Sequence, residues 1–331
     1  MGAHTTLKKI AEHLHVSVST VSRALKDHPD VARETIQRVK DLAQMMDYEP
    51  NAFAVGLRKQ RSNLFAIIVP SVAHFFYRQF IQAVEEESRK IGRSVLIFQS
   101  LDDPSIEADS LKICRHNNVA GIFVALNNNT TNLDPFERMR ELHNFPLLFF
   151  DKVPDESGFH KVEIADEHTG RQAAQILLES GAHHILALFG NEKSGITRKR
   201  KNGFAAAMAG SASYTVDYQY ADNMEMAEAL AADYLRQSTS HAALFCMNDE
   251  ILCGAMLAIQ KLHIKVPEDC SILALSAGFI PQLYVPKISY IETSGYLLGK
   301  HCFNRMMMLS ANKTDRMETA LPCSFIAGGS I

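Results

Sequence analysis

Apolar residues near the start of the chain recur at helical spacing in three stretches, and the first two are separated by a break around residues 15–17. This pattern predicts two short helices joined by a tight turn and a longer third helix that closes a small core. Ser17 is suited to cap the second helix, because its hydroxyl can accept a hydrogen bond from a free backbone N–H of the first turn. The apolar positions are Ile10, Ala11, Leu14, Val16, Val21, Ala24 and Leu25 in the first two helices and Ile36, Val39, Leu42, Ala43 and Met46 in the third.

The predicted second helix has two unlike faces within the stretch VSVSTVSRAL, residues 16–25. One face is apolar and can dock on the head itself, whereas the other carries short hydroxyls and Arg23, which is long enough to reach a phosphate or a guanine. A generic helical bundle needs only the first face, so the pattern favours a helix-turn-helix whose second helix lies in the major groove of DNA. We therefore predict an all-α DNA-binding head over residues 1–47. Its predicted DNA-contacting residues are Thr6, Ser17, Val18, Ser19, Thr20, Ser22 and Arg23.

Residues 48–61 form a short basic segment that starts at Pro50 and can make about two helical turns over residues 51–57. Such a short segment with few apolar anchors is marginal as a free helix. It is either a plain basic linker or a hinge that folds on DNA, where Leu57 could wedge between base steps in the minor groove.

The rest of the chain, residues 62–331, alternates apolar strand-like runs with helical patterns. This alternation predicts parallel sheets covered by helices on both faces. The number of predicted strands is larger than one such sheet would normally hold. We therefore expect an α/β body of two doubly wound lobes, with any ligand beyond the carboxyl ends of the strands. The predicted strands lie at 65–70, 94–100, 120–126, 146–150, 184–190, 242–247 and 271–276, and the clearest helical patterns at 80–91, 170–178 and 251–262.

Two stretches of the head and linker carry a specific resemblance. TLKKIAEHLHVSVSTVSRAL and VARETIQRVKDLAQMMDYEPNAFAVGL resemble the head and hinge helix of the lactose-repressor/galactose-repressor family, and the resemblance continues through essentially the whole chain. By position, it implies that Val18, Ser19 and Arg23 read bases, that Leu57 intercalates, and that Asn51 is the asparagine of the family's Pro-Asn motif. It also implies a homodimer on a near-palindromic DNA operator, with paired hinge helices that open the minor groove.

The linker departs from the family pattern at one point. Members usually have ARSL before the linker, whereas this chain has AVGL at residues 54–57. Gly56 should lower the helix propensity of the hinge by about 0.5–1 kcal/mol relative to alanine. The hinge is therefore expected to depend more strongly on DNA for its folding.

For the body, the resemblance implies a periplasmic-binding-protein-like effector domain whose two lobes are joined by three crossovers around a cleft. The first lobe is expected at about 62–162 with a return segment at 294–322. The second is expected at about 163–293 with the last strand at 323–331. A small-molecule effector, a sugar or sugar derivative, would occupy the cleft.

Six residues are predicted to line this cleft, and most have a plain structural alternative. Asp151 follows a strand and could instead cap the next turn, and Arg200 begins the family's R-x-x-G-F motif but could lie on a helix surface. Asn248, of the family's Asn-Asp pair, could simply cap the following helix. Phe75 and Phe76 match a place where aromatic residues flank the cleft, but they could equally pack in the core.

The sixth cleft position, Ser276, departs from the family pattern. Members usually have an aspartate there that binds sugar hydroxyls, whereas VPEDCSILALSAG places Ser276 and Ala277 at this point. One neutral hydroxyl thus replaces a carboxylate that makes strong charge-assisted hydrogen bonds, which disfavours an ordinary neutral sugar. The nearby run TRKRK, residues 197–201, would suit a sugar acid or sugar phosphate. A solvated helix face is the alternative interpretation of this run.

The distribution of charge differs between the head and the body. Residues 1–61 hold 10 Lys/Arg against 7 Asp/Glu, although the whole chain of 331 residues has a net charge of −3. A basic head on an acidic body suggests that only the head meets a polyanion. The six cysteines are scattered without a C-x-x-C pair, as expected of reduced thiols in a cytoplasmic protein.

Several classes of function find no support in the sequence. No apolar run is long enough to span a membrane, and no secretory signal is recognised at the N-terminus. The histidines lack metal-ligand spacing, and nucleotide-binding and hydrolase motifs are missing, so neither a cofactor nor an enzyme activity is expected. A solute-binding protein for transport would need an export signal and would lack the helix-turn-helix.

The sequence thus predicts a DNA-binding transcriptional regulator, with repression as the expected action, in which effector binding changes lobe closure and shifts operator affinity. One alternative stays open, because Ser276 and Ala277 weaken the sugar-binding pattern. In that alternative the body has lost small-molecule binding, and a partner protein controls the regulator instead.

Overall fold

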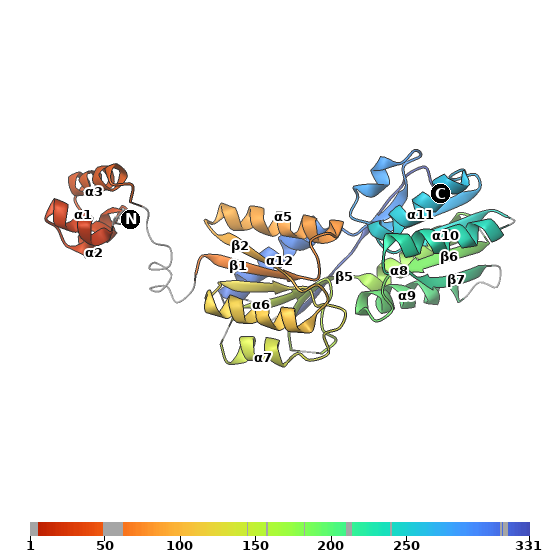
Figure 1. The fold of residues 1–331 in the computed structure, drawn as a ribbon, viewed down its shortest axis with the longest axis horizontal. Coiled ribbons are helices and arrows are strands. Elements are labelled where there is room, and N and C mark those ends of the chain that lie inside the picture. Colours follow the sequence, from red (N-terminus) through yellow and green to blue (C-terminus); the bar gives the residue numbers. More distant parts are fainter. Residues whose placement is uncertain are drawn as a thin grey trace. The chain divides into compact units, whose positions relative to one another are not determined.

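The computed structural model describes residues 6–48 and 62–331, apart from positions 144, 157, 182, 210–213, 239, 312 and 314–316 (Figure 1). Asn51, Leu57 and the rest of the predicted hinge lie outside the described residues. The chain divides into two compact units, and the division falls between Ser62 and Asn63.

The head consists of the three predicted helices, α1 (Leu7–Leu14), α2 (Val18–Ala24) and α3 (Arg33–Met45). Helix α1 ends at His15, whose left-handed backbone (φ 53°) turns the chain toward α2. The two helices meet α3 around a core in which the predicted apolar stripes face one another. The fully or nearly fully buried members of this core are Ile10, Ala11, Val21, Ala24, Val39 and Ala43.

The first lobe of the body is a six-stranded parallel sheet between two pairs of helices. Its strands are β1 (Leu64–Val69), β2 (Ser94–Gln99), β3 (Gly121–Val124), β4 (Leu147–Phe150), β5 (His160–Ile164) and β11 (Glu318–Leu321). Its helices are α5 (Phe75–Lys90), α6 (Pro104–His116), α7 (Asp134–Glu141) and α12 (Gly295–Ser310). The strand order is β11-β5-β4-β3-β1-β2. Alternate residues of β1 face α5 and α12 on one side and α6 and α7 on the other, as expected for a doubly wound sheet (Figure 1).

The second lobe repeats this plan. Its strands are β6 (His184–Phe189), β7 (Thr215–Tyr220), β8 (Ala242–Cys246), β9 (Cys270–Ser276), β10 (Ser289–Glu292) and β12 (Ser324–Ile326). Its helices are α8 (Asp166–Glu179), α9 (Gly195–Met208), α10 (Met224–Gln237), α11 (Asp249–Leu262) and the 3-10 helix η1 (Ile280–Leu283). The strand order is β12-β10-β9-β8-β6-β7, and α8 packs on α9 while α10 packs on α11.

The chain passes between the sheets three times: after β5, after β10 and between β11 and β12. The predicted fold class, a helix-turn-helix head and a body of two α/β lobes, is confirmed. Three details differ from the sequence expectation. Strand β5 continues to Ile164, α5 begins at Phe75 rather than near Phe80, and β12 pairs antiparallel with β10 in an otherwise parallel sheet.

Candidate functional site: an exposed helix face and an interlobe cleft

Helix α2 presents its polar face to solvent. Val18 is 41% exposed, and Ser19 and Arg23 are also exposed, whereas Ser22 is half-buried. Arg23 forms no ion pair with any residue that the structure describes. An exposed valine beside an unpaired arginine is what a helix needs to contact thymine methyls and guanine edges in a major groove.

The other three predicted head residues lie at the N-terminal ends of helices, Thr6 and Ser17 as caps and Thr20 in the first turn of α2. Ser17 accepts a hydrogen bond from the Thr20 backbone N–H (3.0 Å) and also contacts the hydroxyls of Ser19 and Thr20 at 2.7 and 2.8 Å. Thr6 accepts a longer bond from the Lys9 N–H (3.4 Å). Ser17, Thr20 and Thr6 therefore have a structural role at the helix N-termini, which does not exclude phosphate contacts from the same exposed edge.

Between the lobes of the body lies a cavity of about 390 Å³, which we call the first cavity. Its wall is formed where β4, β6, β8 and β9 end and where α5, α9 and α11 begin, so the ends of strands from both sheets converge on it. This is where an open parallel sheet offers a ligand its free backbone groups and helix N-termini. Of the six predicted cleft residues, four line the cavity: Phe76, Asp151, Arg200 and Asn248.

Asp151 follows β4 directly and has a left-handed backbone (φ 57°) that is uncommon for a residue with a side chain. The Tyr77 hydroxyl donates a hydrogen bond to Oδ2 of its carboxylate (2.7 Å). Burial raises the pKa of Asp151, and this hydrogen bond acts in the opposite direction. A carboxylate held in this way can accept hydrogen bonds from ligand hydroxyls at its other oxygen.

Arg200 is 6% exposed and does not lie on a helix surface. Its Nε donates to Oδ1 of the buried Asp166 (2.7 Å), and its Nη1 donates to the Met247 carbonyl (3.1 Å). Burial acts to lower the pKa of Arg200, but the Asp166 carboxylate more than offsets this and holds the pKa above its usual value. The guanidinium is therefore fixed in position, with further N–H groups at the cavity wall.

The R-x-x-G-F motif that begins at Arg200 has a packing explanation as well. A Cβ at Gly203 would overlap the Glu167 carbonyl of α8, and one at Gly170 of α8 would overlap the Arg200 carbonyl. The two helices can thus approach closely only because both crossing positions are glycine. This close approach brings Arg200 next to Asp166 at the start of α8.

Asn248 is both a cap and part of the wall. Its Oδ1 accepts a hydrogen bond from the Ile251 N–H (2.8 Å), which caps α11. The residue also lines the first cavity, so its amide NH₂ group is left for a ligand. The two interpretations of Asn248 are therefore compatible.

Ser276 lies behind the wall rather than on it. It is 1% exposed, and its hydroxyl donates to Oδ1 of Asp249 (2.5 Å), while the Ala277 N–H donates to Oδ2 (2.9 Å). Asp249 and Ala277, in contrast, do line the cavity. The expectation that Ser276 meets the effector is not matched, because Asp249 occupies that place with its carboxylate. Burial raises the pKa of Asp249.

Phe75 also differs from the expectation. Phe76 lines the first cavity, whereas the Phe75 ring packs beside Phe279 of the other lobe (centroids 6.2 Å apart) and under the Arg78 guanidinium. Because α5 begins at Phe75, the two rings point in different directions from its first turn. Phe75 is a contact between the lobes rather than a wall residue.

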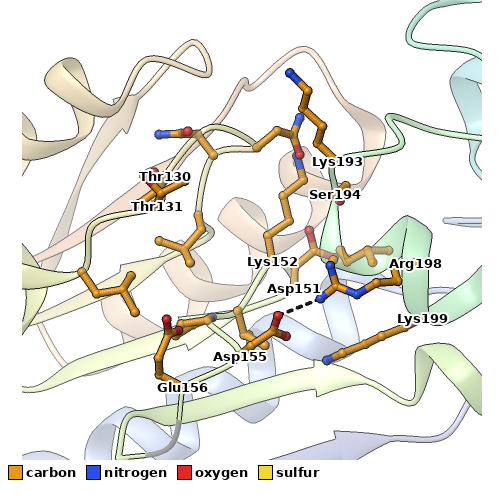
Figure 2. A pocket seen from close by; sticks show the side chains of 18 residues that line it. Thr130, Thr131, Asp151, Lys152, Asp155, Glu156, Lys193, Ser194, Arg198 and Lys199 are labelled. Carbon is orange, nitrogen blue, oxygen red and sulfur yellow. Dashed lines mark hydrogen bonds and ion pairs between the residues drawn. The ribbon is translucent and has the colours of Figure 1, made fainter.

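The basic run at residues 198–201 does not form a single anion site. Arg198 pairs with Asp155 (2.7 Å), Lys199 pairs with Glu163 (2.5 Å), and Lys201 donates to the Tyr220 hydroxyl (2.6 Å). Each cation of α9 therefore has a partner of its own; the Arg198–Asp155 pair is drawn in Figure 2. The first cavity is lined by five carboxylates against Lys152 and Arg200, so its charge does not favour an anion.

Two features of the cleft were missed from the sequence. His74 and Glu250 come from different lobes and pair at 3.1 Å, which raises the pKa of His74 chiefly through this hydrogen bond. Thr197 is 1% exposed, and its hydroxyl has no hydrogen-bond partner among the residues that the structure describes. Neither feature has a local signal, because in both cases the geometry depends on distant segments.

Comparison with known proteins identifies the family. The family model for bacterial regulatory proteins of the lacI family matches residues 6–51, and the model for periplasmic binding proteins and the sugar binding domain of the LacI family matches residues 63–328. The chain belongs to the LacI family. The resemblance inferred from the head and hinge motifs is thereby confirmed, and this LacI-family chain is a DNA-binding transcriptional regulator.

Similar proteins extend over nearly the whole chain. The HTH-type transcriptional regulator DegA of Bacillus subtilis is 26% identical over 296 residues (87% of this chain and 86% of DegA), and a transcriptional repressor PurR of Haemophilus influenzae is 25% identical over 324 residues (95% and 93%). Among solved structures, a lac repressor dimer bound to operator has a TM-score of 0.88 at 21% identity, with 99% of each chain covered. That structural likeness shows the fold.

Other kinds of site are not seen in the described part of this LacI-family chain. Within it, no helix is both long and apolar enough to cross a membrane. The same residues contain no group of three or more histidine, cysteine, aspartate or glutamate side chains that could hold a metal ion.

Proposed function

We propose that this LacI-family regulator acts as a repressor, binds a near-palindromic operator as a homodimer, and has its DNA affinity set by a carbohydrate in the interlobe cleft. The first cavity, with wall residues from both lobes, is the observation that carries this proposal. A ligand that contacts both lobes changes their relative free energy, and only such a difference in affinity can shift a conformational equilibrium.

For the DNA contact, the exposed face of α2 supplies the support. Val18, Ser19 and Arg23 are exposed and can meet base edges, and the N-termini of α1 and α2 can meet phosphates. The solved lac repressor with a similar fold is described as a dimer bound to operator, and we extend both properties to this chain. The roles of Asn51 and Leu57 remain part of this proposal.

For the homodimer, exposed apolar residues around η1 of the second lobe are the supporting feature. Phe279, Leu283 and Val285 are 56, 60 and 100% exposed. Monomeric proteins seldom expose several large apolar side chains within one short segment unless a partner covers them.

For the effector, the lining favours a polyol. Phe76 and Tyr77 offer apolar ring surface, and Asp151, Asn248 and Arg200 offer acceptors and donors fixed by partners of their own. Two solved structures of similar fold are described as complexes with cellobiose and with D-xylulofuranose, which is consistent with this class. A sugar acid or sugar phosphate is the second candidate, and the paired cations of α9 count against it.

The alternative of a body controlled only by a partner protein is disfavoured by the cavity itself. A volume of about 390 Å³ lies within the range of roughly 300–1,000 Å³ typical of small-molecule sites. The buried, unpartnered hydroxyl of Thr197 at its wall would be costly without a ligand or water.

A thermal-denaturation screen of the full chain tests the effector. The panel would hold neutral sugars, sugar acids, sugar phosphates and nucleosides, because a ligand that binds only the native state adds RT ln(1 + [L]/Kd) to stability, about 2.7 kcal/mol at a hundredfold excess over Kd. We expect a shift with neutral sugars. A shift with acids or phosphates only would favour the second candidate, and none with any compound would favour partner control.

A further inference from the structure

A second cavity of about 200 Å³ lies behind the first one. The two share the wall residues Asn128, Asp151, Lys152, Ser194 and Ile196, so they are adjoining parts of one interlobe space. Figure 2 shows the second cavity: Thr130 and Thr131 lie on one side, Ser194 and Arg198 of the other lobe lie opposite, and Asp151 and Lys152 lie between them.

The first lobe contributes two segments to this wall, residues 151–156 after β4 and the polar loop at residues 126–133. The sequence of the loop, LNNNTTNL, is explained by no part of the proposed function. Two acidic side chains hold this loop in place. Glu107, 1% exposed, accepts from the Asn127 N–H (3.1 Å) and the Thr130 hydroxyl (2.6 Å), and Asp102 accepts from the Asn128 N–H (3.0 Å).

This anchoring is costly for the protein. Burial raises the pKa of Glu107, which shows that the environment disfavours its charged form. A loop that only connected β3 to α7 would not need a buried carboxylate, because loops on a surface satisfy their backbone groups with water. Rigid support of this kind is typical of a wall that must keep ligand-binding groups in position.

The chemistry of the second cavity is mixed. Its wall holds carboxylates, cationic groups and hydroxyls. The carboxylates are those of Asp151, Asp155 and Glu156, the cations are Lys152, Lys193, Arg198 and Lys199, and the hydroxyls are those of Thr130, Thr131 and Ser194. An anion would meet the carboxylates here, and a cation would meet the lysines. Sugar hydroxyls, in contrast, both donate and accept hydrogen bonds, so they match a wall that contains both donors and acceptors.

The second cavity also differs from the first in having no aromatic ring in its wall, so it provides polar contacts without a stacking surface. Two residues of its wall, Arg198 of one lobe and Asp155 of the other, form an ion pair between the lobes (Figure 2). A molecule that fills both cavities would therefore contact more of the interlobe surface than one that fills the first cavity alone.

We propose that the second cavity is a ligand subsite for the second unit of a two-unit carbohydrate whose first unit occupies the first cavity. Because it rests on the proposed carbohydrate effector, this inference deepens that function. The second subsite makes the regulator selective for disaccharides, and the loop at residues 126–133 is its specificity wall.

The full chain allows a direct test at Gly195, which lines the second cavity at the start of α9. A Cβ placed there would have only the Arg198 guanidinium within 4 Å, at 3.8 Å, so a larger side chain can be added without a backbone clash. Gly195→Met would extend a chain of three further atoms into the subsite, and Gly195→Ala is the matched control that adds only the Cβ.

The probes are monosaccharides and disaccharides built from them: glucose with maltose, cellobiose and trehalose, galactose with lactose and melibiose, and xylose with xylobiose. Affinities would be measured by calorimetry. We expect at least one disaccharide to bind the wild type at least about tenfold more tightly than its own monosaccharide. Gly195→Met should remove this advantage while changing monosaccharide affinity little, and Gly195→Ala should retain it.

A second variant examines the loop. Glu107→Gln keeps the shape of the side chain but weakens the anchor, so disaccharide affinity should fall more than monosaccharide affinity. Equal affinities within each pair, or a disaccharide advantage that survives Gly195→Met, would overturn the subsite and leave the carbohydrate effector intact. If no sugar of the panel binds, both the subsite and the carbohydrate effector are rejected.

Discussion

The recognition face of α2 and the wall of the cleft use polar side chains in opposite ways. On α2, Ser19 and Arg23 are exposed, and Arg23 has no ion-pair partner among the described residues. In the cleft, Arg200 and Asp249 are buried, and each is held by partners from a distant part of the chain. The side chains on the recognition face of the head are therefore fixed only when DNA binds, whereas the side chains of the cleft are held in place before a ligand binds.

The largest expected effect concerns the buried ion pair. Arg200→Ala leaves the Asp166 carboxylate buried without its partner, so the free energy of unfolding should fall by about 3–5 kcal/mol. Arg198→Ala on the same helix removes an exposed pair and should cost at most about 1 kcal/mol. Urea denaturation of both variants measures the difference, and similar losses would contradict the preorganised cleft.

A second prediction concerns the residue behind the wall. Ser276→Asp would place a carboxylate against Asp249, so we expect stability to fall by roughly 2–3 kcal/mol at neutral pH. Mutual repulsion raises the pKa of such a pair in the folded state, and protonation then favours folding. The deficit should therefore shrink as the pH falls through the raised pKa.

Ser276→Ala is the control for that variant, because it loses two hydrogen bonds, one donated to Asp249 and one accepted from the Gly278 N–H (2.9 Å), without adding a second carboxylate. It should cost about 1–3 kcal/mol and should not recover as the pH falls in the way that Ser276→Asp does. Thermal denaturation between pH 4.5 and 7.5 would follow both variants. A Ser276→Asp protein as stable as the wild type at pH 7.5 would mean that residue 276 faces the cavity after all.

For the exposed face of α2, we expect a substitution to change DNA binding rather than stability, unlike the substitutions in the cleft. Arg23→Ala should leave thermal stability unchanged but weaken specific DNA binding by about 1–3 kcal/mol and relax base preference at one position of each half-site. Selection from a random DNA pool followed by polarisation assays with wild type and variant would measure this. An unchanged preference would remove Arg23 from base recognition and leave Val18 and Ser19 as the candidate readers.

The smallest effect is expected at His74 and Glu250, which are partly exposed. The pKa of His74 is raised, so its contribution is present at pH values below its ordinary pKa and is lost as the pH rises through the raised value. His74→Gln should therefore lower stability by no more than about 1 kcal/mol near pH 5.5 and by less near pH 8. A deficit that does not depend on pH would mean that packing with Tyr77 matters more than charge.

The contrast between the two regions also explains what could be predicted from the sequence. The head is built from local rules: apolar spacing gave its three helices, and Ser17 caps α2 as expected. In the body, the same rules located the apolar strands β1, β2, β3, β4, β6, β8 and β9, but not the shorter or more polar β5, β7, β10, β11 and β12. They also located the wall residues Asp151 and Asn248, because both directly follow a strand.

What the sequence could not supply was the partner of each cleft residue. Arg200 meets Asp166 because two helices cross at glycines, and Ser276 meets Asp249 because β8 and β9 are neighbours. The direction in which Phe75 points depends on the residue at which α5 begins, and helix boundaries are the least certain part of a pattern-based prediction.

The short crossing between β11 and β12 has a consequence for how the protein is made. Leu321 ends a strand of one sheet and Ser324 begins a strand of the other, so a single late segment supplies an edge to both lobes. The first sheet therefore cannot be completed before Leu321 has been synthesised, and the second cannot be completed before Ile326. Both lobes therefore gain their last strand only at the end of synthesis, although most of the first lobe is synthesised long before the second.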